Sequence, residues 1–225
     1  MKTNVMTNQS KTLFSTKQMV MVSLFSALAY VLMLFHLPYK HLGFLEFEFS
    51  DIPAVIAALQ FGPLSGVIVE LIKNLIKALT ASTTGMVGEL ANFLISCAFI
   101  IPVGLLNKLR NIKKRNVTGT DMANKTKSSN AIYMIGTFTI ATLAMTLTGA
   151  LLNYFIMVPL YAKLFGGMDS VTGLASQYVP AIKDLATLVI IGITPYNIVK
   201  GIMISVVGYY TYRLLRVSLF RLEGK

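Results

Sequence analysis

The stretch IPAVIAALQFGPLSGVIVELIKNLIKAL, residues 52–79, decides which fold this chain adopts. It is mostly apolar, as a helix buried in lipid or protein must be, but Gly62-Pro63 interrupts it. Proline lacks the N–H that a helix interior needs, and glycine tolerates conformations that other residues avoid. The stretch is therefore either one kinked helix or two helices that turn at residues 61–63.

The composition is that of an integral membrane protein. Hydrophobic residues make up 55% of the 225 residues and charged residues only 13%, and the mean hydropathy is +0.67. Four more apolar stretches lie at about 19–37, 86–107, 131–159 and 182–212. Such stretches are typical of helices that cross a bilayer, so this is not a soluble protein.

The formal net charge of +11 is concentrated in three places: the N-terminal tail, the connector after residue 107 and the chain end from residue 213. We interpret it as the positive charge of cytoplasmic segments rather than as a nucleic-acid surface. For all three segments to lie on one side of the membrane, an even number of spans must separate the N-terminal tail from the connector. This is the case only if residues 52–79 form two helices and not one. The sequence thus predicts a single all-α membrane domain (1–225) with six transmembrane helices and both termini in the cytoplasm.

The predicted boundaries follow from the apolar stretches. A cytoplasmic tail (1–17) precedes helices one to four (18–107), a cytoplasmic linker (108–130) leads to helices five and six (131–213), and a second tail (214–225) ends the chain. The second helix has about 10 residues and is about 15 Å long, less than the ~30 Å hydrocarbon core, so its neighbours must shield it.

An ionisable side chain within a membrane span needs a structural or functional explanation, since its insertion into the bilayer costs about 2.5–3.5 kcal/mol on insertion scales. Glu70 and Lys73 are three residues apart on one helix and are interpreted as an internal ion pair. Glu89 and Asn92 have the same spacing at the outer end of their helix, where the helix dipole suits Glu89. Together they form a candidate polar patch.

Two amides and a lysine form a more specific pattern. Asn153 lies near the outer end of the fifth span, and Asn197 and Lys200 share a face of the last span after a break at Thr194-Pro195. Interhelical hydrogen bonding explains an asparagine well, but it explains poorly a lysine that has no acidic residue near it in the sequence. An amide that donates and accepts and an ammonium that donates suit a neutral, flat ligand rich in carbonyl and N–H groups.

The segment LEFEFSDIP, residues 45–53, alternates apolar and polar residues between two spans. In a strand, Phe47 and Phe49 would point to one face and the acidic residues to the other. The segment is either a lid, with its phenylalanines over a pocket and Glu46, Glu48 and Asp51 in water, or an interfacial loop. As a lid it would contribute four contact residues: Leu45, Glu46, Phe47 and Phe49.

Sequence motifs of enzymes and ATPases are absent from the chain. It has no Gly-x-Ser-x-Gly, no Gly-x-x-x-x-Gly-Lys, no His-Glu-x-x-His and no paired aspartates, and its one cysteine and two histidines have no metal-ligand spacing. We therefore expect no catalytic site, metal or cofactor, and any energised transport would need partner subunits.

Five short motifs follow one another along the chain: LEFEFSDIP (45–53), FGP (61–63), ELIKN (70–74), GELANF (88–93) and NIVK (197–200). In this order they resemble the riboflavin-specific substrate-binding subunits, or S components, of energy-coupling factor (ECF) transporters, over roughly residues 17–213. The resemblance implies a six-helix bundle in the bacterial plasma membrane, with a pocket near the outer face beneath the loop that joins the first two helices. It implies riboflavin as the transported ligand and contacts to its uracil edge from Asn153, Asn197 and Lys200.

The resemblance also implies partners. S components work with a transmembrane coupling subunit and two ATPase subunits, and their first helix usually offers an Ala-x-x-x-Ala face to the coupling subunit. The nearest match here is Ser23-x-x-x-Ala27, and serine still permits close helix approach. Two alternatives remain: an S component for another vitamin, and a structural or regulatory membrane protein whose polar residues only join helices.

Overall fold

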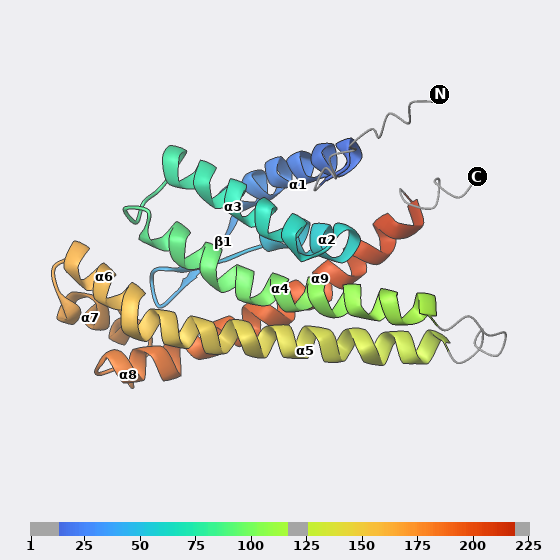
Figure 1. Ribbon diagram of the computed structural model, residues 1–225. Helices are drawn as coiled ribbons and strands as arrows, with labels where there is room; N and C mark the ends of the chain where they lie inside the picture. Colours follow the sequence, from blue (N-terminus) through green and yellow to red (C-terminus); the bar gives the residue numbers. More distant parts are fainter. Residues whose placement is uncertain (1–13, 117–125, 219–225) are drawn as a thin grey trace, which may run out of the picture.

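The computed structural model describes residues 14–116 and 126–218, which are mainly helical (Figure 1). Helix α1 (Thr16–Leu34) leads to a hairpin of β1 (His36–His41) and β2 (Leu45–Glu48), whose strands pair antiparallel. The helices that follow are α2 (Asp51–Phe61), α3 (Pro63–Thr80), α4 (Val87–Asn116), α5 (Thr126–Leu152), α6 (Val158–Leu164), α7 (Met168–Tyr178), α8 (Leu185–Thr187) and α9 (Thr194–Ser218). Two π-helical turns, η1 (Asn153–Met157) and η2 (Leu188–Ile193), precede α6 and α9.

The prediction of a helical membrane protein is confirmed. In the described part of the chain, four helical stretches are long and apolar enough to cross a membrane: Thr16–Leu34, Val87–Ile112, Ala131–Leu164 and Leu185–Leu215. Large apolar side chains such as Leu24, Leu143 and Ile190 lie exposed on these stretches. In water that exposure would be unfavourable, whereas in lipid it is expected.

Residues 52–79 form two helices, as the charge argument predicted. Helix α2 ends at Phe61, Gly62 adopts φ = +102°, and α3 begins at Pro63. Glycine suits this backbone conformation, and proline is tolerated in the first turn of a helix because its missing N–H would have no helical partner there. Across the turn, the Asn107 side chain donates to the Leu59 carbonyl (2.7 Å), so α4 holds the end of α2.

The elements are arranged so that the two ends of the bundle differ (Figure 1). The start of α1, the end of α4, the start of α5 and the end of α9 lie at one end. The turn between α3 and α4, together with α6 and α7, lies at the other end. The described basic residues Lys17, Lys108, Arg110 and Arg213 belong to the first end, and a second cluster of buried apolar residues from α6, α7 and η2 belongs to the opposite one.

Two predicted boundaries differ from the structure. Helix α4 continues to Asn116 instead of ending near residue 107, because lysine, arginine and leucine are good helix formers and no glycine or proline follows Gly104 there. Helix α5 begins at Thr126 and not at residue 131, so the predicted linker is shorter at both ends. Residues 117–125 of that linker lie outside the described residues, as do residues 1–13 and 219–225 of the predicted tails.

Helix α7 was not predicted. It is short, and only its inward face, with Val171 and Ala175, is apolar and buried.

Candidate ligand-binding site

A cavity of about 790 Å³ lies among the β1–β2 hairpin, α4, α6, α7 and α9. Seven of the predicted site residues line it: Leu45, Glu46, Glu89, Asn92, Asn153, Asn197 and Lys200. Phe47 and Phe49 are not among the lining residues. The volume falls in the range of small-molecule and cofactor sites.

The two asparagines that line the cavity lie at or just after the two π-helical turns. Asn153 opens η1, and Asn197 lies one turn after η2. The Asn153 side-chain N–H donates to the Gly149 carbonyl (2.7 Å) and that of Asn197 to the Ile193 carbonyl (3.1 Å). Each amide nitrogen uses one of its two N–H groups within its own helix, so the second N–H can donate to a ligand and the amide oxygen can accept from one.

Gly149 allows α5 and α9 to approach at this point. A Cβ added to Gly149 would lie 2.5 Å from the side-chain nitrogen of Asn197. Any larger residue would therefore displace the Asn197 amide. Asn153, which follows α5, and Asn197 of α9 both line the cavity.

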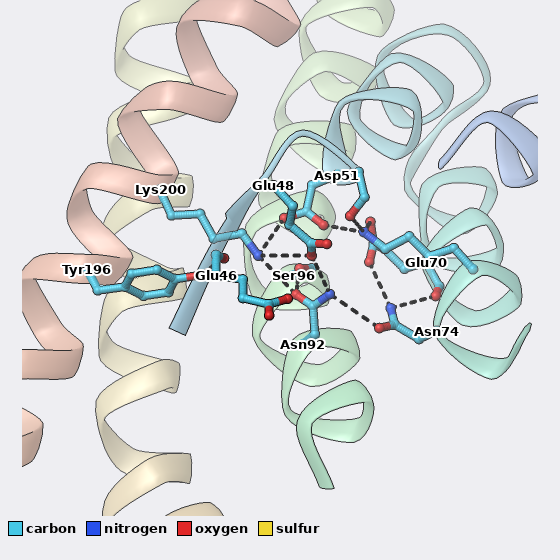
Figure 2. A network of polar contacts seen from close by, with 11 residues as sticks. Glu46, Glu48, Asp51, Glu70, Asn74, Asn92, Ser96, Tyr196 and Lys200 are labelled. Atoms are coloured by element: carbon cyan, nitrogen blue, oxygen red, sulfur yellow. Dashed lines mark hydrogen bonds and ion pairs between the residues drawn. The ribbon is translucent and has the colours of Figure 1, made fainter. Parts of the chain in front are cut away.

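Lys200 has acidic neighbours that the sequence argument did not foresee (Figure 2). Its ammonium donates to the Asn92 side-chain oxygen (2.9 Å) and pairs with Asp51 Oδ2 at 3.1 Å, while Glu48 Oε1 is 3.9 Å away. No acidic residue lies near Lys200 in the sequence, but the inference that this lysine is otherwise unpaired is wrong, because two acids from about 150 residues earlier lie beside it. Lys200 nevertheless lines the cavity.

The same network continues to α3. Lys73 pairs with Glu70 Oε1 at 2.8 Å, which confirms the predicted internal ion pair, and it also pairs with Asp51 and donates to Ser50 Oγ (2.8 Å). Asn92 joins both halves, since its N–H groups donate to Glu48 Oε1 (2.9 Å) and to the Asn74 side-chain oxygen (3.3 Å). One buried polar network therefore joins the hairpin, α2, α3, α4 and α9 (Figure 2).

Two of the three acidic side chains that the lid interpretation placed in water are buried instead. Glu48 is 5% exposed and Asp51 is 1% exposed, because protein covers them and supplies a lysine partner. Glu46 is half-buried and lines the cavity. The Phe47 ring packs on Tyr196, with centroids 4.7 Å apart, and Phe49 packs against the main apolar core. Both phenylalanines are thus covered by protein side chains and do not face the cavity.

Hydrogen bonds link the hairpin to α9 through Tyr196 and to η2 through His41. The Tyr196 hydroxyl donates to the Glu46 carbonyl (2.6 Å), and the His41 ring Nε2 lies 3.2 Å from the Gly192 carbonyl. The His41 and Tyr196 rings stack with centroids 5.9 Å apart. Sequence reasoning missed Tyr196 and the partner role of Asp51; the position of Tyr196 next to Asn197 was the only available signal.

Glu89 is satisfied locally. Ser82 and Thr84 donate hydroxyl hydrogen bonds to Glu89 Oε2 (3.0 and 3.1 Å), and the residue lies in the first turn of α4. Hydroxyl donors and a helix N-terminus both favour a carboxylate. Glu89 nevertheless lines the cavity and could contact a ligand there.

The predicted docking residues of α1 lie on its outward face. Ser23 and Ala27 are exposed, whereas the neighbouring Ser26 and Ala29 are buried against the bundle. The small side chains therefore leave a shallow strip on the surface of α1.

Comparison with known proteins identifies the family. Residues 17–212 match the family described as ECF transporter, substrate-specific component. The chain is 36% identical to the riboflavin transporter FmnP of Bacillus subtilis (strain 168), with 85% of this chain and 87% of that protein covered, and 33% identical to the riboflavin transporter RibU of Staphylococcus aureus (strain TCH60), with 92% and 94% covered. A solved structure of the S component of a bacterial ECF transporter is 31% identical and superposes with a TM-score of 0.63 over 90% of this chain and 97% of its own. The chain therefore belongs to the substrate-specific components of ECF transporters, which are transport proteins and not enzymes.

Proposed function

We propose that this chain captures riboflavin at the outer face of a bacterial plasma membrane and holds it for ATP-driven uptake. The observation that carries the proposal is the set of Asn153, Asn197 and Lys200 along one cavity. The relatives named above are riboflavin transporters, which supports the same ligand.

The chemistry of the cavity wall fits the uracil-like edge of riboflavin. That edge alternates carbonyl oxygens with a ring N–H. An amide oxygen of Asn153 or Asn197 would accept from the N–H, and the remaining amide N–H groups and the Lys200 ammonium would donate to the carbonyl oxygens. An ion pair holds Lys200, so the ligand does not need to supply a charge.

The proposed topology has six transmembrane helices, with both termini in the cytoplasm and the cavity toward the outside. It is supported by Lys17, Lys108, Arg110 and Arg213, which belong to the elements at the end of the bundle opposite the cavity. Helix α2 would be the short span. Its residues from Asp51 to Leu59 are buried, so neighbouring helices shield it from lipid.

The proposed partners are a transmembrane coupling subunit and two ATPase subunits. The chain carries no nucleotide-binding motif, so it would bind its vitamin alone and would need those subunits for uptake. The Ser23 and Ala27 strip on α1 would receive the coupling subunit.

Purified protein in detergent tests the proposal directly. Bound riboflavin should colour the preparation yellow, and added riboflavin should lose fluorescence on binding. Lys200→Ala should weaken binding at least tenfold, about 1.4 kcal/mol, whereas Lys163→Ala, on the exposed end of α6, should not change it. A folded wild-type protein that is colourless and quenches no riboflavin fluorescence would contradict the proposal.

A further inference from the structure

We infer that Asp51 is the positioning residue that holds the Lys200 ammonium in place for the ligand. The inference rests on the proposed function and assigns a role to a residue outside the cavity wall. Asp51 is the first residue of α2, directly after the hairpin, and is 1% exposed.

The two oxygens of Asp51 serve two different lysines. Oδ1 pairs with Lys73 on α3, and Oδ2 pairs with Lys200 on α9 at 3.1 Å (Figure 2). Without a negative group between them, two ammonium groups buried in the same network would repel each other. Asp51 therefore sets where the Lys200 ammonium rests.

The hydrogen-bonding capacity of Lys200 leaves room for a ligand. An ammonium has three N–H groups. Asn92 accepts from one (2.9 Å), and Asp51 lies on a second side, whereas Glu48 Oε1 at 3.9 Å is too far for a hydrogen bond. Because Lys200 lines the cavity, the remaining N–H can donate to a ligand carbonyl.

The position of Asp51 in the network points to a functional reason for it. The network joins the carboxyl groups of Glu48, Asp51 and Glu70 with the ammonium groups of Lys73 and Lys200. The ion pair of Glu70 is with Lys73, and Glu48 Oε1 is 3.9 Å from the Lys200 ammonium, whereas Asp51 pairs with both lysines. Asp51 is therefore the acid that is placed to fix the position of Lys200.

These contacts also supply a matched pair of variants. Asp51→Asn and Glu70→Gln each replace one carboxyl group of the network by an amide of the same shape. Asp51 contacts both lysines, whereas the ion pair of Glu70 is with Lys73. A general effect of altering the network would appear in both variants, and a positioning effect only in Asp51→Asn.

The experiment measures riboflavin affinity by fluorescence quenching in a double-mutant cycle of Asp51 and Lys200. Asp51→Asn should weaken binding at least tenfold, and Glu70→Gln less than threefold. In a Lys200→Met background, adding Asp51→Asn should weaken binding less than threefold further, because the group that Asp51 positions is already gone.

Three results would overturn the inference while leaving the proposed function intact. They are an equal loss from Asp51→Asn in both backgrounds, an equal loss from Glu70→Gln, and an Asp51→Asn protein that does not fold when Glu70→Gln does. Each would make Asp51 a structural residue only. If the wild-type protein binds no riboflavin, the proposed function fails and the inference fails with it.

Discussion

Replacing Tyr196 with phenylalanine should loosen the hairpin at the cavity without disturbing the rest of the site. The hydroxyl of Tyr196 donates to the Glu46 carbonyl, while its ring packs on Phe47 and stacks with His41. Phenylalanine keeps the ring and removes only the hydroxyl. The substitution therefore isolates one hydrogen bond between α9 and the hairpin.

The expected magnitude follows from that single bond. A typical intramolecular hydrogen bond contributes about 0.5–1.5 kcal/mol net. At about 1.4 kcal/mol per factor of ten, the population of the open hairpin should rise about two- to tenfold. Riboflavin release should speed up by a similar factor if the hairpin must open before the vitamin leaves.

Hydrogen exchange of residues 44–48, read by mass spectrometry, measures this opening. Exchange there should be faster in Tyr196→Phe, and saturating riboflavin should slow it in both proteins. Tyr133→Phe is the matched control, since it removes a hydroxyl bond to the Leu106 carbonyl (2.7 Å) at the other end of the bundle. Unchanged exchange in Tyr196→Phe, or an equal change in Tyr133→Phe, would refute the reasoning.

Two further predictions test the cavity wall and the docking strip. Gly149→Ala should weaken riboflavin binding at least fivefold with little change in melting temperature, because its Cβ would displace the flexible Asn197 amide and not the backbone; Gly136→Ala on the same helix meets open space and should bind like wild type. Ala27→Trp should abolish uptake in cells while purified protein still binds riboflavin, since bulk there blocks close helix approach, whereas Ile140→Trp on the exposed face of α5 should leave uptake intact. Equal affinity in the two glycine variants, or uptake preserved in Ala27→Trp, would contradict the respective prediction.

The sequence predicted the helical membrane fold because hydropathy and the positive-inside rule depend on local composition. The break at Gly62-Pro63 was readable for the same reason, since the backbone needs of both residues are local. The ion pair of Glu70 and Lys73 is also local, at three residues along one helix. The sequence also predicted three ligand-binding residues, Asn153, Asn197 and Lys200, because polar groups at membrane depth need partners.

The partners of those polar groups depend on contacts between elements that are far apart in the sequence. Lys200 lies beside Glu48 and Asp51 because the end of β2 and the start of α2 pack between α3 and α9. These contacts join residues about 150 positions apart in the sequence. The alternation of the hairpin was visible in the sequence, but which of its faces water reaches depends on what packs against it. Burial is a property of the whole bundle, and for that reason Glu48 and Asp51, which were predicted to lie in water, are inside the protein beside Lys200.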